Sequence, residues 1–487
     1  MIRLTADDGL TIPEDHVEDF GRIFGAFEQG VEYVLASDDY IPTVDLTAYP
    51  RTGIHIPDDT DEGGWATKCV GKAVVLKKEL LQGKTIALKD NVALAGVRCT
   101  NGTNAIPNWV PRLDATIVTR IMDSGGVITG KAACENACLE GVSDSSCTGI
   151  VHNPYAHGYS CGGSSSGSGR LVASGSVDMA IGCDQGGSIR IPASMCGIVG
   201  LKPTWGLVPY TGIIGLEGTI DHTGPMAKTV EDAALLLEVI ARPDKIDDRQ
   251  PYFMPSSMLN HHTQLQEWLR TTDQAVPLRG IQVGILKEAF TIPNMDENVK
   301  TLCAAAASRL TELGAEVREV SVPAHTNGSL LWTFLLPDAA TEQGLLSKAS
   351  GRKQLMMTDR VMTSSTSLTQ EAFDALGPSA RNLYLRHLYM KKKYGSTLHA
   401  KCTNLIRKLS EDYDRALDAV DVLVMPTLPT PACRLFDKPA DHGPLARTTR
   451  NIGLVGNTSP FNCTYPGHSG QSEGVNLTTT QQPGILP

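Results

Sequence analysis

Short apolar runs and longer amphipathic segments alternate along this chain from about residue 84 onward. KTIALK (84–89) predicts a strand, DATIVTRIMDSGG (114–126) predicts a helix ended by two glycines, and VITGK (127–131) predicts a buried strand. Later segments repeat the pattern, with strands predicted over 280–290, 315–323 and 421–432 and helices over 229–242 and 297–314. Alternation of this kind is typical of an α/β domain, so we expect a mixed sheet covered by helices on both faces.

The first 70 residues follow a different pattern, which predicts an N-terminal helical extension and a linker. Apolar side chains recur at helical spacing from Val17 to Val34, as in an amphipathic helix. Its apolar face would cover the main domain or a second copy of the chain, so a homodimer is one expectation. The stretch from Tyr40 to Trp65 is rich in Pro, Asp, Gly and Thr, which favours a linker. We expect the α/β domain to span 71–463 and an atypical tail to span 464–487.

Charge and apolar patterning exclude several classes of partner. The formal net charge of -10 argues against a nucleic-acid-binding protein, which usually carries a basic surface. No apolar run approaches the roughly 18 residues of a membrane span, and the N-terminus lacks the apolar region of a secretory signal. The 12 cysteines are scattered without framework spacing, which favours reduced thiols. We therefore expect a cytoplasmic protein that acts on a small molecule, without nucleic-acid or membrane partners.

Two glycine-rich stretches lie close together, CGGSSSGSGR (161–170) and DQGGSIR (184–190). Glycine allows a ligand to approach main-chain N–H groups, but tight turns or phosphate binding at a helix N-terminus would use the same residues. The run 163–167 also matches the G-x-S-x-G pattern, in which Ser165 would be a nucleophile that needs a separate acid and histidine. Local pattern alone leaves these interpretations open.

Six segments together resemble the amidase signature family over most of residues 70–464. They are ALKDNVALAGV, CGGSSSGSG, IGCDQGGSIRIPASMCGIVGLKPTWGLVPYTG, TIDHTGPMAKTVEDAALLLEVIA, DVLVMPTLPTPA and NTSPFN, in the family's order. The chain looks most similar to the broad-specificity amidases found beside nitrile hydratases, which also carry an N-terminal helical extension. The resemblance implies the amidase signature fold and hydrolysis of a small amide, with no cofactor and no metal.

The resemblance also implies the site residues. Ser188 would be the nucleophile, Ser164 a bridging serine after a cis peptide bond, and Lys89 the base. The backbone N–H groups of Gln185, Gly186, Gly187 and Ser188 would form the oxyanion hole, in which glycines let the amides converge.

Acid–base chemistry sets a requirement on this trio of serine, serine and lysine. A serine hydroxyl needs a base to take its proton, and lysine is a base only when it is neutral. Half neutralisation at pH 7 requires a downward pKa shift of about three units from ~10.4, which burial without a carboxylate partner can supply.

Nearby residues have simpler expected roles. Asp184 and Arg190 flank the loop and are expected to form an ion pair that holds its shape. Ser165 is expected either to join the hydrogen-bond network of the lysine or to cap the following helix. Asp90 is expected to be a structural anchor.

The resemblance ends after NTSPFNCT, where the family continues with a Gly-His-Pro segment, more strands and a closing helix. This chain reads YPGHSGQSEGVNLTTTQQPGILP instead, with no Lys or Arg. Its composition predicts a disordered tail, so we expect the domain to lack its last strands. Two alternatives to an active amidase therefore stand: a truncated non-catalytic relative, and an amidotransferase-type subunit.

Overall fold

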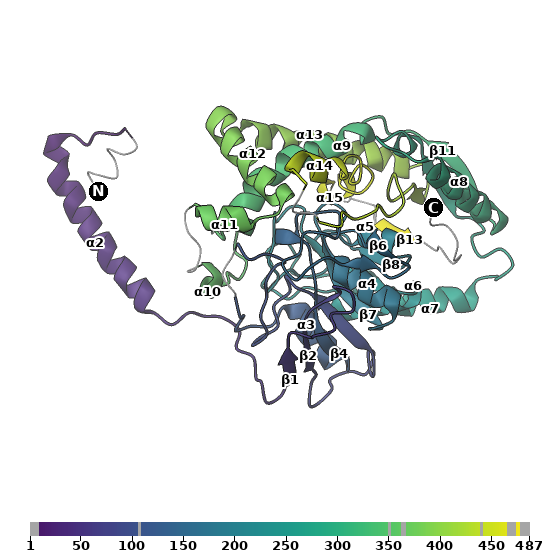
Figure 1. Cartoon of the computed structure of the whole chain (residues 1–487), viewed down its shortest axis with the longest axis horizontal. Helices are drawn as coiled ribbons and strands as arrows, with labels where there is room; N and C mark the ends of the chain where they lie inside the picture. The colour runs from purple at the N-terminus through teal and green to yellow at the C-terminus, as the bar shows by residue number, and fades with distance from the viewer. Residues whose placement is uncertain are drawn as a thin grey trace. The chain divides into compact units, whose positions relative to one another are not determined.

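The structure is a computed structural model that describes residues 9–105, 109–348, 352–361, 367–438, 442–464 and, for the backbone only, 474–477. The chain divides into two units, Met1–Pro42 and Thr43–Pro487. The first unit contains the short helix η1 (Glu14–His16) and the long helix α2 (Val17–Ala36), which is the helix expected there (Figure 1). No residue of α2 is buried.

The second unit is built on an eight-stranded mixed sheet with the order β1-β2-β4-β3-β7-β9-β8-β13. β3 is parallel to both of its neighbours, β4 and β7, and the other pairs are antiparallel. The strands are β1 (Arg51–His55), β2 (Trp65–Gly71), β3 (Thr85–Lys89), β4 (Val127–Ala132), β7 (Met179–Asp184), β8 (Val199–Lys202), β9 (His222–Ala227) and β13 (Gly474–Leu477). The predicted mixed α/β sheet is confirmed.

Helices cover both faces of this sheet. α3 (Thr116–Asp123) and α6 (Val230–Ile240) pack on one face, against alternate strand residues such as Ile86 and Leu88. α4 (Ser166–Ser174) and α5 (Arg190–Met195) pack on the other face, where Ala87 and Ala180 belong to a second apolar cluster. Because side chains alternate along a strand, Lys89 at the end of β3 shares the α4 face with Ala87.

The remaining elements extend this core. A parallel three-stranded sheet has the order β11-β10-β12, and a hairpin pairs β5 with β6. Their bounds are β5 (His152–Asn153), β6 (Ala156–Ser160), β10 (Gln282–Leu286), β11 (Glu316–Val320) and β12 (Val422–Val424). The other helices are η2 (Asn136–Cys138), η3 (Ser256–Met258), α7 (His261–Thr271), η4 (Lys287–Phe290), α8 (Glu297–Glu312), α9 (His325–Ala339), η5 (Ala340–Leu345), α10 (Thr358–Val361), α11 (Gln370–Ala375), α12 (Pro378–Tyr394), α13 (Thr397–Leu417), α14 (Pro444–Thr449) and α15 (Pro460–Cys463).

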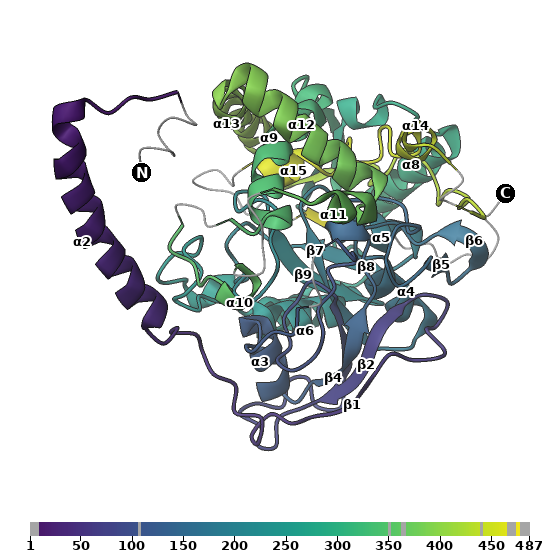
Figure 2. The same cartoon turned by 60° about the vertical axis from the view of Figure 1, so that its left-hand side comes forward.

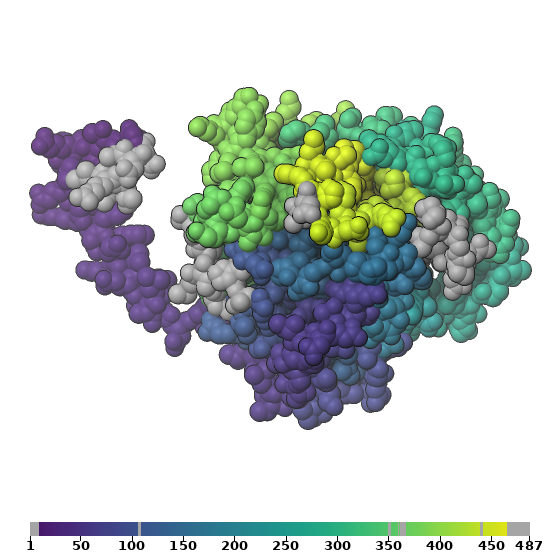
Figure 3. All heavy atoms as spheres, in the orientation of Figure 1, coloured from purple at the N-terminus to yellow at the C-terminus, as the bar shows by residue number. Residues whose placement is uncertain are grey.

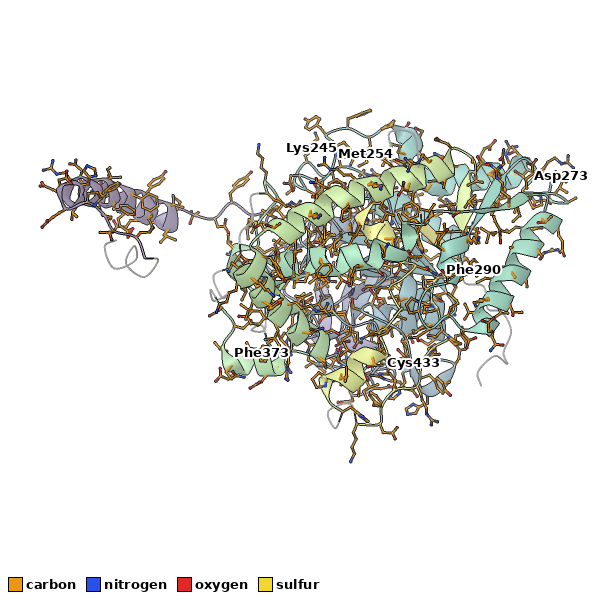
Figure 4. The ribbon with its side chains drawn as sticks, turned by 90° about the horizontal axis from the view of Figure 1, so that it is seen from above. Lys245, Met254, Asp273, Phe290, Phe373 and Cys433 are labelled. Atoms are coloured by element: carbon orange, nitrogen blue, oxygen red, sulfur yellow. The ribbon has the colours of Figure 1, made fainter. Side chains whose placement is uncertain are left out.

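A helical layer centred on α9 lies at one end of the second unit. α9 contacts α12, α13 and α15, and Figure 2 shows these four helices together beyond the edge of the sheet. Phe290 of η4 and Phe373 of α11, both labelled in Figure 4, pack into separate apolar clusters of this layer. The segment 442–464 lies beside the layer, as the yellow atoms in Figure 3 show. α9 and this late segment are therefore placed together, although they are far apart in the sequence.

Several boundaries differ from simple expectation. β1 lies inside the stretch 40–65 whose composition favours a linker, and it pairs with β2 through backbone hydrogen bonds that composition does not reveal. The predicted tail 464–487 falls largely outside the described residues, and within it Gly474–Leu477 pair with β8.

All 12 cysteines lie among the described residues and are free. In the described part of the chain, no helix combines the length and apolarity needed to cross a membrane.

Candidate active site

The candidate site lies where the parallel strands β3 and β7 end. Lys89 is the last residue of β3, and the loop Gln185–Ile189 follows directly after Asp184, the last residue of β7. Carboxyl ends of parallel neighbours meet at one sheet edge, so this register places the lysine beside the glycine-rich loop. α4 begins at Ser166 above the same edge and brings Ser164 and Ser165 to it.

Lys89 and Ser164 are in direct contact. The Lys89 Nζ lies 2.8 Å from Ser164 Oγ and 3.3 Å from the Cys183 carbonyl oxygen. Both side chains are fully buried, and the peptide bond between Gly163 and Ser164 is cis. Two of the three residues that the sequence predicted as the catalytic trio are therefore joined.

Ser188 is placed differently. It is the one half-buried residue in the otherwise buried run 179–193. Among the described residues, that hydroxyl makes no hydrogen bond. The structure thus contains no direct bond between Ser188 and Ser164.

Two opposing influences act on the pKa of Lys89. Burial acts to lower it, whereas Cys138, Cys183, Cys134 and Asp184 act to raise it, and on balance the pKa lies above its ordinary value. Burial raises the pKa of the Cys183 thiol, and the contact with Cys138 together with burial raises that of Cys134. Both thiols therefore keep their protons at neutral pH.

Cys138 is the sulfur that still carries partial charge near neutral pH. Its contact with Cys134 lowers its pKa to about 7 despite burial, and Lys89 acts in the same direction. Within the described residues, Lys89 itself forms no ion pair with a carboxylate. At neutral pH, burial therefore acts against Cys138 and Asp184 in setting its protonation.

A buried ion pair braces the loop. Arg190 Nε and Nη2 donate to the two carboxylate oxygens of Asp184 at 3.0 and 3.1 Å, and Asn462 Nδ2 donates to Asp184 Oδ1 at 2.8 Å. Burial alone would raise the pKa of Asp184, but Arg190 and these donors hold it below its ordinary value. The expected ion pair is present, and Asn462 from α15 completes it.

The loop N–H groups are not equivalent. Gly187 N–H donates to Asp184 Oδ1 at 2.8 Å, and Ile189 N–H donates to Asp184 Oδ2 at 3.0 Å. Among the described residues, the N–H groups of Gln185, Gly186 and Ser188 have no acceptor. Of the four N–H groups expected to form an oxyanion hole, that of Gly187 thus already donates to the Asp184 carboxylate.

Two carbonyl groups of the loop have partners from distant helices. Trp332 Nε1 donates to Gln185 O at 2.7 Å, and Thr458 Oγ1 donates to Gly186 O at 2.6 Å. A Cβ on residue 186 would lie 2.7 Å from the Trp332 ring, and one on residue 187 would lie 2.6 Å from Thr458 Oγ1. The Trp332 ring at position 186, and Thr458 together with a φ of +142° at position 187, explain why both positions require glycine.

The Gln185 side chain leads away from the loop toward a cavity. Its Nε2 donates to Tyr210 Oη at 2.8 Å and to Asp221 Oδ1 at 2.9 Å. Tyr210 and Asp221 line a cavity of about 70 Å³ with Thr211, Arg352 and Arg360. Burial raises the pKa of Asp221 to about 6, although Arg249 acts against the shift.

The alternatives for Ser165 can now be compared. Its hydroxyl donates to the Cys183 carbonyl at 3.2 Å, the group that Lys89 also contacts, and it makes no cap bond at the start of α4. It is fully buried, which does not suit the exposed nucleophile of a G-x-S-x-G motif. Asp90 accepts from the buried Lys131 at 3.1 Å and is thus an anchor between strands.

Glu135 is a buried residue near the site that local pattern did not indicate. Its carboxyl accepts from Ser166 Oγ at 2.6 Å, Ser145 Oγ at 2.7 Å and Ser145 N–H at 2.8 Å, and its own N–H donates to Ser164 O at 3.1 Å. Burial raises the pKa of Glu135 to about 8. Trp332 was likewise missed, whereas Thr458 and Asn462 lie within the NTSPFN segment.

The chain is similar to known proteins along most of its length. The model of the Amidase family matches residues 65–473. An enantioselective amidase from Rhodococcus rhodochrous is 38% identical over 388 residues, which cover 79% of this chain and 72% of that protein. A glutamyl-tRNA(Gln) amidotransferase subunit from Synechococcus sp. (strain CC9902) is 34% identical over 353 residues, 72% of this chain and 69% of that one.

Solved structures agree with this similarity. Native peptide amidase from Stenotrophomonas maltophilia matches with a TM-score of 0.58 and 28% identity, covering 74% of this chain and 72% of that one. The corresponding glutamyl-tRNA(Gln) amidotransferase subunit from Thermotoga maritima matches with a TM-score of 0.63 and 25% identity, covering 83% and 79%.

Proposed function

Because this chain belongs to the amidase signature family, we propose that it is an amidase that hydrolyses a small carboxamide to a carboxylic acid and ammonia. The observation that carries the proposal is the contact between the buried Lys89 Nζ and Ser164 Oγ, beside a loop with N–H groups that lack acceptors among the described residues. A base, a proton relay and oxyanion donors are the parts that acyl transfer through a serine requires.

The first step forms a bond between Ser188 Oγ and the amide carbonyl carbon. The Ser188 proton passes to Ser164 Oγ, and the Ser164 proton passes to the neutral Lys89 amine. The carbonyl oxygen then carries the negative charge of the tetrahedral intermediate. Ser188 is the one partly exposed residue of the loop 185–189, which suits it for attack on a substrate from outside.

Neutral Lys89 is the state that this step uses. Its hydrogen-bond partners are a hydroxyl and a carbonyl, and Asp184, which acts to raise its pKa, is paired with Arg190. With the thiols of Cys134 and Cys183 protonated, burial favours the uncharged amine, and Cys138 and Asp184 act against it.

The N–H groups of Gln185, Gly186 and Ser188 are the proposed donors to the oxyanion. We leave out Gly187 because its N–H donates to Asp184. Removal of one such donor typically lowers kcat about 10²–10³-fold.

The second half of the reaction returns the proton. Ser164 gives a proton to the leaving nitrogen, Lys89 restores the proton of Ser164, the C–N bond breaks, and ammonia departs. Water then attacks the ester on Ser188 with Lys89 and Ser164 again taking its proton, which releases the acid and restores the serine.

An amidotransferase-type subunit is the second candidate, favoured by the 34% identity to a subunit of glutamyl-tRNA(Gln) amidotransferase. It would use the same residues to release ammonia from an amide, but would pass the ammonia to an acceptor held by another protein chain. The two candidates differ in whether the chain alone turns over a panel of amides.

The test measures ammonia release by the purified full chain from short aliphatic amides, aromatic amides and glutamine. Ser188→Ala is expected to abolish release, and Ser194→Ala, a nearby partly exposed serine on α5, is the matched control that retains it. Added hydroxylamine is expected to divert the acyl-enzyme to a hydroxamate.

Three outcomes contradict the proposal or select an alternative. Release from glutamine alone, and only with a partner present, favours the amidotransferase-type subunit. Equal release by Ser188→Ala excludes Ser188 as nucleophile. A folded, monodisperse chain that releases no ammonia from any amide is the non-catalytic relative.

A further inference from the structure

Trp332 lies far from the reacting residues in the sequence, yet its indole N–H donates to the carbonyl of Gln185 at 2.7 Å. We infer that Trp332 is a positioning residue, which orients the Gly186 N–H toward the oxyanion and strengthens it as a donor. The inference rests on the proposed function, because it concerns the oxyanion hole of that reaction.

Peptide geometry transmits the effect of the indole. The carbonyl of Gln185 and the N–H of Gly186 belong to one planar peptide unit, and in a trans unit they point in opposite directions. Among the described residues, the cis peptide bond is the one after Gly163, so the unit between Gln185 and Gly186 is trans. Fixing the carbonyl toward the indole therefore aims the N–H of Gly186 away from it.

The next peptide unit provides an internal contrast. Thr458 Oγ1 fixes the carbonyl of Gly186 at 2.6 Å, and the N–H of the same unit, on Gly187, donates to Asp184. Both peptide units have a carbonyl held by a hydrogen bond. The N–H of the unit held by Thr458 donates to Asp184, whereas the N–H of the unit held by Trp332 has no acceptor among the described residues. Trp332 thus acts on a donor that remains open for substrate.

Polarisation adds to orientation. A carbonyl that accepts a hydrogen bond draws electron density from its amide nitrogen, so the N–H of the same unit becomes a better donor. The indole is a neutral donor without acceptor capacity, and it leaves the net charge of the site unchanged. The ring also lies against Gly186, where a Cβ would lie 2.7 Å from it.

Trp332 is itself held by buried contacts of α9. His325 at the start of the helix bonds Tyr413 Oη at 2.6 Å and Asn457 Oδ1 at 2.9 Å. Asn457 precedes Thr458, and its Nδ2 donates to Pro426 O at 2.8 Å. Asn457 therefore links α9, which carries Trp332, to Thr458. The donors to the Gln185 and Gly186 carbonyls thus belong to one hydrogen-bonded network, which limits independent movement of Trp332.

The test uses Trp332→Phe, which keeps an aromatic ring and removes the N–H. Its kcat for amide hydrolysis is expected to fall roughly ten- to thirtyfold, less than for outright loss of an oxyanion donor, while KM changes less than about twofold. Trp205→Phe is the matched control, because Trp205 Nε1 donates to Gly218 O at 3.1 Å outside the loop. It is expected to retain kcat.

A second readout does not depend on amide turnover. A fluorophosphonate forms a covalent P–O bond with Ser188 and releases fluoride, and its phosphoryl oxygen uses the same oxyanion donors. Intact mass spectrometry is expected to show slower labelling of Trp332→Phe than of Trp205→Phe or the parent chain. Where Trp332→Phe lowers the folded fraction, β-(3-benzothienyl)alanine at 332 keeps the ring size and replaces only the N–H.

The outcomes separate the two proposals. Parent activity with equal kcat and labelling rates in Trp332→Phe and Trp205→Phe overturns the inference and leaves the proposed function intact. A raised KM with unchanged kcat also overturns it, because Trp332 would then contact substrate instead of orienting the loop. Labelling of the parent without hydrolysis of any amide contradicts the proposed function, and the labelling rates then decide the inference. Absence of both reactions overturns both.

Discussion

Lys89 and Lys131 are both fully buried, on the neighbouring strands β3 and β4, but their partners differ. Lys131 pairs with Leu88 in the sheet and lies on the face of α3 and α6, where it donates to Asp90 at 3.1 Å. Lys89 pairs with Ala132 on the opposite face, and its partners are a hydroxyl and a carbonyl. The same residue type at the same burial therefore pairs with a carboxylate in one place and in the other contacts a hydroxyl and a carbonyl, where we propose it as the base.

The pKa balance follows from these partners. Burial acts to lower the pKa of Lys131, whereas Cys99 and Asp90 act to raise it, and the pKa lies above its ordinary value. Burial raises the pKa of Cys99 to about 12, so this thiol keeps its proton at neutral pH, as Cys134 and Cys183 do beside Lys89. Asp90 forms an ion pair with Lys131 at 3.1 Å. Around Lys89 the attractions come from Cys138, Cys183, Cys134 and Asp184. The thiols of Cys134 and Cys183 keep their protons, and Asp184 is paired with Arg190.

Replacement of each lysine by methionine would separate the two roles, and the larger effect is expected at Lys89. Lys89→Met is expected to lower kcat/KM about 10²–10⁴-fold, because no group remains to accept the proton of Ser164. The melting temperature is expected to change little, since methionine fills the buried space. Ammonia release and thermal melting measure both effects. Lys89→Arg, which keeps the charge and cannot act as a base at neutral pH, should be as inactive; activity within tenfold of the parent would exclude Lys89 as the base.

Lys131→Met should show the opposite pattern. It leaves the Asp90 carboxylate buried without a cation, so the free energy of unfolding is expected to fall by about 3–5 kcal/mol. Urea denaturation measures this change, and kcat of the folded fraction is expected to stay within a few-fold of the parent. Asp90→Asn combined with Lys131→Met should recover part of the stability. If stability is unchanged in Lys131→Met, the ion pair with Asp90 is not an anchor.

Glu135 extends the comparison to a buried carboxyl without a cation partner among the described residues. Its folded pKa of about 8 lies above the ordinary 4.5, so between these pH values the folded state holds a proton that the unfolded state has lost. The free energy of unfolding should therefore fall as pH rises through this window, by up to about 1.4 kcal/mol per pH unit.

Urea denaturation of the parent and of Glu135→Gln at several pH values tests this. The difference between the two is expected to change by about 2–3 kcal/mol between pH 5.5 and 7.5, in the direction that weakens the parent at high pH. Parallel pH profiles for the two chains would mean that Glu135 is ionised in the folded state.

The smallest effect is expected when Lys89 is given a carboxylate, as Lys131 has. Cys138→Asp would place one beside Lys89, and Asn101 Nδ2, a buried donor without a partner among the described residues, is available to it. The pKa of Lys89 should rise, so the acid limb of kcat/KM should move upward by about one pH unit, with about tenfold less activity at pH 7. Cys138→Ser is the control without a charge. An unmoved acid limb in Cys138→Asp would show that this limb does not report Lys89.

The sequence predicted much of the fold because its strand and helix signals are local. Strands and helices were expected around β3, α3, β4, α6, β10, α8 and β11, and all seven are present. β1 was missed because its strand state comes from pairing with β2, not from its own Pro- and Gly-rich surroundings.

The candidate site likewise has residues that the sequence predicted and residues that it did not. Lys89, Ser164 and Ser188 stand in motifs that resemble a family, and each motif is readable by itself. The roles of Trp332, Thr458 and Asn462 depend on hydrogen bonds to residues 147, 272 and 278 positions away, which no local pattern encodes. The use of Gly187 N–H by Asp184 likewise depends on how the loop closes.

The late position of these loop partners has a consequence for the timing of synthesis. A ribosome makes Lys89, Ser164 and Ser188 well before α9, and it makes Asn462 278 residues after Asp184. At about 5–20 residues per second, Asn462 follows Asp184 by roughly 14–56 s. A nascent chain that ends before α9 thus carries all three reactive side chains, but neither the indole that aims the Gly186 N–H nor the amide that completes the brace. On the proposed function, the site is therefore completed only after α9 and α15 have been made and have reached the loop.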